Sequence, residues 1–537
     1  MQAIRQVALT LVLFALGGCW AQVAMADDAA ELFDPAKMYV IKLTLPPEKE
    51  TVLGKTKTQP VTHPFDYQSG GTFSIAKTDG TPDGVGPFTD PVPVKVRLKG
   101  NWSLRYLDEK AAFKVKFEDP DPQFNLRVLT LNNMVTDPSM IHETLAYTAY
   151  RGVDVPASRT GYAYVYLNGR DYGIHLNIET VDEIALAKLF GSFDEGTQHL
   201  YEGEDGDEVL PGTAEEFEVD EGVEENLDDL EELIEAVNSS GSQSWAERVT
   251  AAADLEEMTR MWATEKYIGQ WDGYAGAEES WMPNNYYLYS DPSGVFQMLP
   301  WGNDETWLAQ HHLAFDGHAG LMFDLCLEDP TCFAVYREAV AAVRKDILGM
   351  GLDTLAIDTA ALLAPWQEME EQESTREEWG REEFEDGVEE TRDFIATRPA
   401  EAAEWLRLNE TPTPGTAPTG ATSASTEAAK SGGPGGSRLR VGRTSMAGGV
   451  LRTRMQLRTG GLVTQRATVS TGRGALVICR DRARVGQARS LTLRCQLPAS
   501  ILERLRQKPL GITVATRFFP AGGSPENIAR WITLPRL

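Results

Sequence analysis

Beyond its N-terminus the chain lacks any segment of about 20 residues that is apolar enough to span a bilayer. At the start, Arg5 precedes the apolar run 7–16, and the small-residue pattern 24–26 (Ala-Met-Ala) fits a signal-peptidase site. We therefore expect residues 1–26 to be a signal peptide and the mature protein to be exported and soluble. The alternative is a lipobox, LGGC, which would leave Cys19 as a lipidated first residue.

Cysteine is scarce, and the five cysteines of this 537-residue chain include no CxxC pair. Because no nearby histidine completes a set of four ligands, a metal site at the cysteines is the weaker interpretation. Apart from Cys19, four cysteines remain in two close pairs, Cys326 with Cys332 and Cys479 with Cys495. An even number of closely spaced cysteines in an exported chain predicts two local disulfides.

Positive charge is scarce outside the last hundred residues. Residues 438–537 carry 19 Lys+Arg against 3 Asp+Glu, a net of +16, whereas residues 1–437 carry 31 against 77, a net of −46. The acidic part should repel nucleic acid. The basic part could attract a polyanion, such as an anionic wall or polysaccharide, or the acidic part of its own chain. The alternative is an Arg-rich, solvated sheet face.

Length and composition predict several domains and no internal repeat. Residues 411–437 are rich in Pro, Gly, Ser and Thr and low in apolar residues, which predicts a linker. Short alternating runs in 438–537 indicate a small all-β, sandwich-like domain that carries Cys479 and Cys495. Residues 27–410 mix strand and helix patterns, so the predicted fold class is α+β.

Within the larger domain, FKVKF at 113–117 alternates apolar and basic residues as a half-buried strand does. The pattern of 137–152 predicts a helix that ends on a glycine, and 162–179 predicts a hairpin around Asn168-Gly169. Residues 244–271 and 333–408 are helical by pattern. The very acidic stretch 190–238 is interpreted as a solvated face. A divalent-cation trap is the alternative, but no calcium-loop spacing is present.

The stretch from Trp271 to Trp307 has the residue types that phosphoryl transfer requires. Asp272 stands a dozen residues before Asn284 and Asn285, and Asp304 follows the apolar run VFQMLPW. An aspartate must orient the attacking hydroxyl, and an asparagine and a further aspartate must hold the metal. The strands YYLY and VFQML, joined by DPSG, predict a hairpin that brings these ends together. The alternative is an ordinary aromatic core hairpin.

Eight ordered blocks carry a family resemblance: KGNWSLR, FKVKF, DPSMIHETLAY, YVYLNGRDYGIHLNIE, LYEG, WDGY, NNYYLY and PWGND. Together they span about residues 92–310 and resemble the CotH kinase family, the spore-coat protein H-like proteins. The resemblance implies an atypical, two-lobed protein-kinase fold. It also implies transfer of phosphate from ATP, with Mg²⁺ or Mn²⁺, to Ser or Thr of an envelope, matrix or coat protein.

The resemblance also implies roles for the residues around the predicted hairpin. Asp272 matches the catalytic aspartate of the family, and Asp304 matches its metal-binding aspartate in the WDxD-type block. Asn284 or Asn285 would stand in the place of a second metal ligand.

A second set of residues would face the nucleotide. Lys116, or Lys114 as the alternative, matches the basic residue on the phosphates. Glu143 would pair with that lysine, as the αC glutamate does in ordinary kinases. Arg105 and Asn101 belong to the turn that would cover the nucleotide.

The chain departs from the family pattern at several positions. Lys99 stands where the family usually has Arg, Trp102-Ser103 stands in place of Ser-Ser, and Gly302 replaces the first Asp of WDxD. If that Asp is a metal ligand, activity would be weak or absent; if it is structural, Asn303 could compensate. The alternative function is therefore a non-catalytic scaffold or adhesion protein with a kinase-like fold, anchored through the basic β-domain.

Overall fold

The computed structural model describes most of the chain in two compact units. The described residues are 29–54, 65–100, 102–118, 124–203, 206–276, 283–308, 313–317, 320–373, 378–410, 438–447, 449–471, 474–485, 487–497, 499–508, 510–520, 526–534 and 536. Unit 1 contains residues 1–133 and 160–179, and unit 2 contains 134–159 and 180–537. The predicted signal peptide with Cys19 and the predicted linker 411–437 lie outside the described residues. They stay predictions, as do the proposed domain boundaries.

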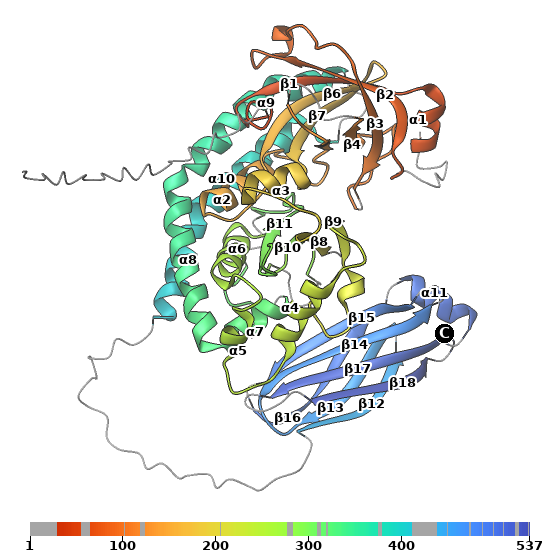
Figure 1. Ribbon diagram of the computed structural model, residues 1–537, viewed down its shortest axis with the longest axis vertical. Coiled ribbons are helices and arrows are strands. Elements are labelled where there is room, and N and C mark those ends of the chain that lie inside the picture. Colours follow the sequence, from red (N-terminus) through yellow and green to blue (C-terminus); the bar gives the residue numbers. More distant parts are fainter. Residues whose placement is uncertain are drawn as a thin grey trace, which may run out of the picture. The chain divides into compact units, whose positions relative to one another are not determined.

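Unit 1 is a closed barrel of seven strands in the order β1-β2-β3-β4-β5-β7-β6 (Figure 1). Its elements are β1 (Met38–Thr44), α1 (Pro47–Leu53), β2 (Gln68–Lys77), η1 (Pro82–Gly84), β3 (Val92–Lys99), β4 (Ala112–Phe117), β5 (Val128–Asn132), β6 (Thr160–Leu167) and β7 (Arg170–Glu179). The parallel pairing of β1 with β6 closes the barrel, and the other neighbours are antiparallel.

Alternating side chains fill the interior of the barrel. In β4, Phe113, Val115 and Phe117 are buried, whereas the lysines between them point outward. The hairpin predicted around Asn168-Gly169 is confirmed as β6 and β7, and both turn residues have positive φ. The closure of seven strands into one barrel was not predicted, because β1 and β6 are far apart in the sequence.

Unit 2 surrounds a small antiparallel sheet with helices. Before residue 411 its elements are α2 (His142–Gly152), α3 (Glu183–Phe190), β8 (His199–Gly203), η2 (Ala214–Glu216), β9 (Glu218–Glu221), α4 (Asp228–Asn238), α5 (Trp245–Val249), α6 (Leu255–Ile268), β10 (Tyr286–Ser290), β11 (Phe296–Pro300), α7 (Leu321–Glu328), α8 (Pro330–Met350), α9 (Leu352–Glu373) and α10 (Arg381–Leu408). The sheet order is β11-β10-β8-β9. The helix predicted over 137–152 is confirmed from His142 to Gly152 and begins five residues later than predicted, and the hairpin predicted over 286–299 is confirmed.

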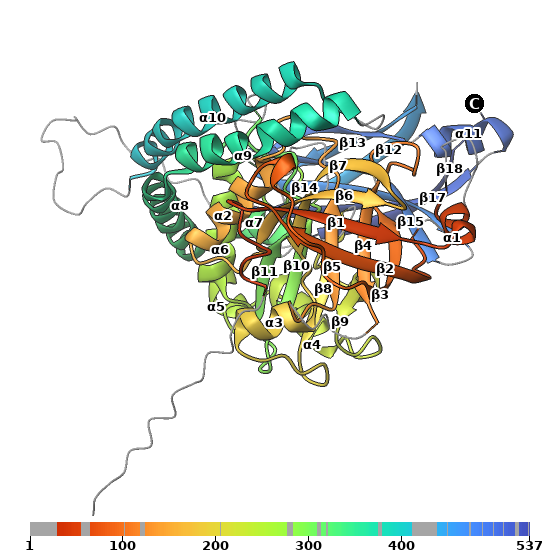
Figure 2. The same ribbon diagram turned by 90° about the horizontal axis from the view of Figure 1, so that it is seen from above.

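Three helices are long, and α10 packs against both α8 and α9. Figure 2 shows α9 and α10 side by side. Helix α6 packs against α8 and α10, and its middle and end are almost entirely buried. At the junction of α7 and α8, the predicted disulfide between Cys326 and Cys332 is confirmed, with their Cα atoms 5.0 Å apart. Among the described residues no single helix has the length and apolarity of a membrane span, and one bent pair, α8 with α9, passes by length and composition together.

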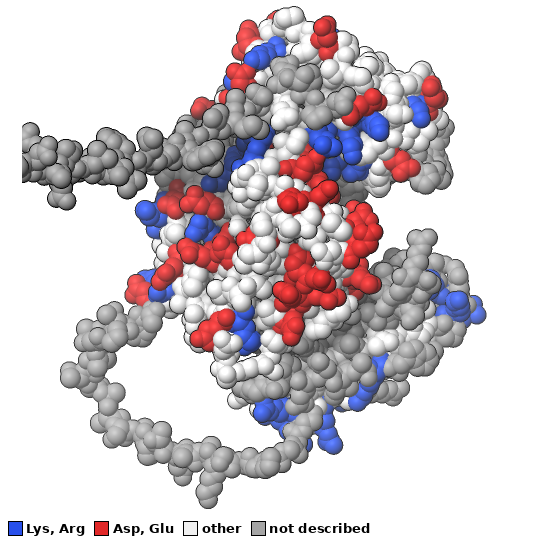
Figure 3. Space-filling model, in the orientation of Figure 1, with Lys and Arg blue, Asp and Glu red and all other residues white. Residues whose placement is uncertain are grey.

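The acidic stretch between α3 and α5 folds as β8, η2, β9 and α4. Figure 3 shows Asp and Glu gathered on the surface around β9 and α4. The exposed acidic side chains include Glu215, Glu216, Glu224 and Glu225. Asp229 is different, because its carboxylate accepts a hydrogen bond from the Tyr201 hydroxyl at 2.6 Å and lies 2.9 Å from His199 Nδ1. The solvated acidic face is thus observed, with one carboxylate serving to hold α4 to the sheet.

The C-terminal residues form two antiparallel sheets, β12-β13-β16 and β15-β14-β17-β18. Their elements are β12 (Leu439–Ala447), β13 (Val450–Leu457), β14 (Gly461–Thr471), β15 (Gly474–Val485), β16 (Arg489–Gln496), α11 (Ala499–Gln507), β17 (Leu510–Pro520) and β18 (Glu526–Leu534). Both sheets contribute to two shared apolar cores, as in a sandwich. The disulfide between Cys479 and Cys495 is confirmed. The expectation of an all-β fold was wrong in one respect, because α11 buries Ile501 and Leu505 in one core.

Candidate functional site

Helix α6 ends immediately before the loop that carries Asp272. Gly269, with φ of +72°, provides the left-handed C-cap that only glycine adopts without strain. The loop then turns back, and the buried Glu265 carboxylate accepts hydrogen bonds from the backbone N–H groups of Tyr274, at 3.1 Å, and Ala275. Burial raises the pKa of Glu265 to about 7, although these N–H groups oppose the shift. A buried acid at the end of α6 therefore fixes the Asp272 loop.

Both asparagines of the NNYYLY block contact Asp272. Asn285 donates from Nδ2 to the Asp272 carboxylate at 2.8 Å and to its carbonyl oxygen at 3.0 Å. Asn284 donates to the same carboxylate oxygen at 3.3 Å. As metal ligands, the two asparagines would have to bind the cation through their side-chain oxygens. In this structure their Nδ2 atoms point toward Asp272 and donate hydrogen bonds to it. They position the aspartate, and only their Oδ1 atoms would be available to a cation.

The two ends of the β10–β11 hairpin meet beside Asn285. The Trp301 N–H donates to the Asn285 carbonyl at 3.0 Å. Gly302 has φ of +52°, and a Cβ at this position would lie 2.3 Å from Asn285 Oδ1. The positive φ and the lack of space for a Cβ therefore explain why a glycine stands at the first Asp position of the WDxD-type block. With the present conformation, a larger side chain would displace the amide that holds Asp272.

A second buried acid of α6 holds the β11 strand. The Glu257 carboxylate accepts the backbone N–H of Met298 at 3.0 Å. Burial raises the pKa of Glu257 to about 8, and Asp254 adds to the shift. Helix α6 therefore fixes both the Asp272 loop and the strand that leads to Asp304.

Asp304 is held by residues around the start of α2. Its side chain accepts a hydrogen bond from the Thr136 hydroxyl, and its backbone carbonyl lies 3.0 Å from His142 Nδ1. The other ring nitrogen of His142 lies 2.9 Å from the Thr391 hydroxyl of α10. The indole N–H of Trp307 donates to the His142 carbonyl at 3.2 Å. Asp304 therefore contacts a segment more than 160 residues earlier in the sequence, and His142 links it to Thr391, more than 80 residues later.

Glu305 brings a third carboxylate to the same place. Its pKa is raised to about 7, first by burial and then by the negative charges of Asp304 and Asp272, while a hydrogen bond with Trp271 opposes the shift. Both aspartates are therefore close enough to Glu305 to repel its charge. A bound cation or a transferred proton would relieve this repulsion.

The predicted nucleotide-facing residues fall in both units. Lys114 and the exposed Lys116 lie on β4 of unit 1, and Arg105 lies in the loop before β4. Glu143 is buried in α2 of unit 2. The ammonium group of Lys116 lies 5.8 Å from the ring centre of Tyr67. The pairing of Lys116 with Glu143 stays a prediction.

Of the predicted nucleotide-facing residues, Glu143 lies near Tyr147, and Asn101 lies outside the described residues. Burial, and next the Glu143 carboxylate, raise the pKa of Tyr147, and Asp304 adds to this shift. Glu143 and Asp304 therefore both lie near Tyr147 within unit 2.

The side chains at this site that could bind a cation would do so through oxygen atoms. In the described part of the chain no group of three or more His, Cys, Asp and Glu side chains is arranged to hold a metal ion. The Asp304 carboxylate and the amide oxygens of Asn284 and Asn285 suit Mg²⁺, which binds few protein ligands and completes its shell with water and substrate phosphates. The donor set fits such an ion and does not suit a metal that requires thiolate or imidazole ligands.

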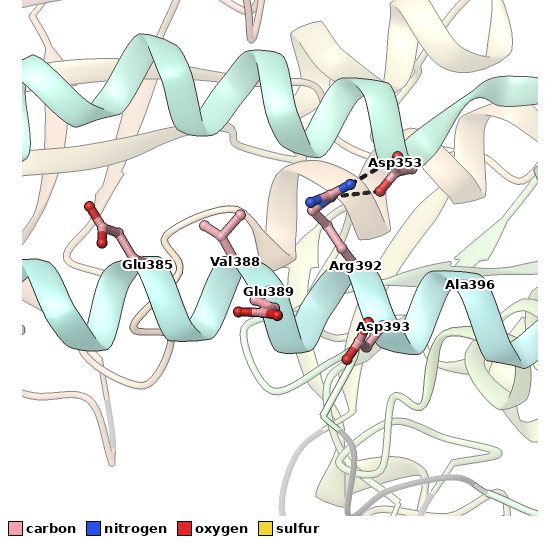
Figure 4. A pocket seen from close by; sticks show the side chains of 7 residues that line it. All are labelled: Asp353, Glu385, Val388, Glu389, Arg392, Asp393 and Ala396. Atoms are coloured by element: carbon pink, nitrogen blue, oxygen red, sulfur yellow. Dashed lines mark hydrogen bonds and ion pairs between the residues drawn. The ribbon is translucent and has the colours of Figure 1, made fainter.

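One hollow of about 580 Å³ lies elsewhere, against α9 and α10. Its lining consists of Asp353, Glu385, Val388, Glu389, Arg392, Asp393 and Ala396. Figure 4 shows that Arg392, the cation among these described lining residues, is paired with Asp353, at 2.7 Å between Nε and Oδ1. None of the predicted site residues lines this hollow.

Comparison with known proteins identifies the family. The model of the CotH kinase protein family matches residues 96–401, more than half of the chain, so the chain belongs to this family. The inner spore coat protein H of Bacillus subtilis (strain 168) is 25% identical over 207 residues, which are 37% of this chain and 55% of that protein. The inner spore coat protein H-like protein of the same strain is 35% identical over 71 residues, 13% of this chain and 22% of that protein. The chain thus spans about half the length of the first relative and less of the second.

Several residues of the site were not found from the sequence. Thr136 and His142 hold Asp304 but are about 160 residues away, and Glu257 and Glu265 look like ordinary helix surface residues. No local signal marked Glu265, because charged residues such as Glu256, Arg260 and Lys266 occur all along its helix.

Proposed function

We propose that this chain is a protein kinase that transfers the γ-phosphate of ATP to Ser or Thr side chains of an envelope, matrix or coat protein. Membership of the CotH kinase family supports the proposal. The observation that carries it is the convergence of three segments at one hairpin end. There, Asn285 contacts the Asp272 carboxylate and packs against Gly302, two residues before Asp304.

In the proposed reaction, Asp272 orients the acceptor hydroxyl and receives its proton as the oxygen attacks the γ-phosphorus. The bond between that phosphorus and the β,γ-bridging oxygen breaks, and ADP leaves. Asp304, with Asn284 or Asn285, would hold Mg²⁺ or Mn²⁺, whose charge would offset that of the phosphates. The protein's contribution is mainly positioning and charge stabilisation.

We further propose that unit 1 and the part of unit 2 before residue 411 correspond to the two lobes of an atypical kinase fold. Lys116, or Lys114, would then contact the phosphates and pair with Glu143, and Arg105 and Asn101 would cover the nucleotide. The order of these residues along the family blocks supports this assignment.

The proposed location is outside the cytoplasm, in the periplasm, at the cell surface or beyond it. The two disulfides fit an oxidising compartment. The name of the first relative, an inner spore coat protein, supports a substrate in a protein coat or comparable layer. An anionic wall polymer or polysaccharide that binds the basic C-terminal domain would keep the enzyme at such a layer.

A second function is favoured by one observation. Gly302 occupies the place of the first Asp of the WDxD-type block, and Asn285 fills the space where its side chain would begin. If the missing carboxylate is essential, the chain would be a scaffold or adhesion protein that keeps the family fold.

Labelled ATP separates the two functions. Purified full-length protein should incorporate phosphate into a Ser/Thr-containing acceptor with Mg²⁺ or Mn²⁺, and Asp272→Asn should not. Absence of both phosphate transfer and nucleotide binding at millimolar ATP with either metal would refute the kinase and leave the scaffold.

A further inference from the structure

The sheet β12-β13-β16 presents a cationic outer face. Burial alternates along β13 and β16, so that Leu451, Met455 and Leu493 enter the cores while the residues between them point outward. The outward arginines of the sheet are Arg440 on β12, Arg452 and Arg454 on β13, and Arg494 on β16. The three strands contain six arginines and no Asp or Glu. We call these four outward arginines the arginine face.

The arrangement of the arginine face is not what stability alone would favour. Arg452 stands directly opposite Arg494 in the antiparallel register. Like charges in a directly opposed cross-strand pair destabilise a sheet. The other outward positions on β13 and β16 include Gln456, Ser490 and Thr492, which can donate hydrogen bonds without adding charge. The face thus combines several cations with neutral donors, which suits an anionic ligand.

The type of cation indicates the chemistry of the anion. Residues 1–437 contain 15 lysines and 16 arginines, whereas 438–537 contain 1 lysine and 18 arginines. A general preference for positive charge would use both residues. Guanidinium groups bind phosphate oxygens through two parallel hydrogen bonds, which ammonium groups cannot do. The bias towards arginine therefore points to an oxyanion, either a carboxylate or a phosphate. A phosphate carries more negative charge and more acceptor oxygens than a carboxylate, so it would bind such a face more strongly.

The spacing of the face indicates the shape of the ligand. Alternate residues of a strand recur about every 7 Å, as Arg452 and Arg454 do, and phosphates on alternate residues of an extended peptide recur at the same interval. Neighbouring strands lie about 4.8 Å apart, so Arg494 widens the row formed on β13. A regular row with this spacing matches an extended peptide.

We propose that the arginine face binds multiply phosphorylated, extended protein segments, which are the product of the transfer proposed above. The proposal rests on that function for the source of its ligand. The enzyme would stay attached to a layer that it has already phosphorylated, and unmodified acceptor nearby would then be presented at a high effective concentration.

Binding of synthetic peptides tests the proposal without ATP. The full-length protein should bind a fluorescent peptide with phosphoserine at four alternate positions at physiological ionic strength. It should bind the same peptide with Ser or Glu at those positions at least about 10-fold more weakly. The triple variant Arg452→Gln/Arg454→Gln/Arg494→Gln should weaken phosphopeptide binding by a similar factor. The matched control Arg504→Gln/Arg506→Gln/Lys508→Gln removes the same charge around α11 and should retain binding.

Equal losses in the two triple variants would overturn the proposal, because binding would then follow net charge alone. Equal affinity for the Glu peptide, for double-stranded DNA or for poly(glycerol phosphate) would overturn it too. Should the Gln triple fail to fold, the Lys triple at the same positions keeps the charge and should still lose about 10-fold, because the paired hydrogen bonds are gone. Failure of the kinase proposal would appear separately, as phosphopeptide binding without phosphate incorporation.

Discussion

Helix α6 supports the two sides of the candidate site in the same way, through one buried glutamate on each side. Near its start, Glu257 holds β11 and so the segment that leads to Asp304, and at its end Glu265 holds the loop of Asp272. Both glutamates are buried and have raised pKa values, of about 8 and about 7. One helix therefore sets the distance between two carboxylates with different proposed roles.

The two sides differ in what else supports them. Asp272 is held by side chains close in sequence, Asn284 and Asn285. Asp304 depends on Thr136 and His142, which come from a segment more than 160 residues earlier. The contacts that hold Asp272 come from one loop and one hairpin. The contacts that hold Asp304 form only when the start of α2 and the residues just before it are folded against the Asp304 segment.

The largest expected effect is on turnover. Asp272→Asn should lower the rate of phosphate transfer by roughly 10²–10⁴-fold, because an amide cannot take the hydroxyl proton. Steady-state kinetics should show the loss in kcat with little change in the KM for ATP. Asp291→Asn, in the turn of the same hairpin, is the matched control and should keep wild-type rates. A loss confined to KM would instead assign Asp272 to nucleotide binding.

The next effect concerns the support of the loop. Glu265→Ala leaves the buried N–H groups of Tyr274 and Ala275 without their acceptor, which should lower the free energy of unfolding by about 2–4 kcal/mol. Urea unfolding monitored by tryptophan fluorescence measures the change. Glu256→Ala, an exposed position on the same helix, should change stability by at most about 0.5 kcal/mol. Similar values for both variants would show that the loop does not depend on Glu265.

A smaller effect isolates the contact between Gly302 and Asn285. Gly302→Ala and Gly294→Ala both place a side chain at positive φ, which costs about 1–2 kcal/mol of unfolding free energy. Only Gly302→Ala also meets Asn285, so its cost should exceed that of Gly294→Ala by about 1–3 kcal/mol. Combining Gly302→Ala with Asn285→Ala should remove the excess. Equal costs for the two glycine variants would contradict the packing argument.

The last effect, which is spread over several pH units, is on the pH dependence of stability. The pKa of Glu257 is raised in the folded state, so the folded protein holds a proton that the unfolded chain releases above its ordinary pKa. Stability should therefore fall as the pH rises from about 4.5 to about 8, by up to about 1.4 kcal/mol per pH unit. Glu257→Gln should remove this contribution while Glu256→Gln should not, in unfolding curves at pH 5, 6 and 7. Parallel wild-type and Glu257→Gln profiles would be inconsistent with a raised pKa.

Local patterns predicted much of this structure. The β10–β11 and β6–β7 hairpins, helix α2 and both disulfides follow from turn residues, periodicity and spacing over short distances. Closure of the barrel by β1 and β6 does not, because nothing in either strand specifies its partner. The hold of Thr136 on Asp304 and the packing of Gly302 against Asn285 likewise depend on tertiary contacts that no local pattern encodes.

Calorimetry of ATP binding with magnesium tests the division of roles between Asp272 and Asp304 most directly. Wild-type protein and Asp272→Asn should bind MgATP with similar affinity, because Asp272 acts on the acceptor hydroxyl. Asp304→Ala should lose metal-dependent binding, because Mg²⁺ requires oxygen ligands and this variant removes the carboxylate proposed to hold it. Equal binding by all three proteins, or loss of binding in Asp272→Asn alone, would contradict the account.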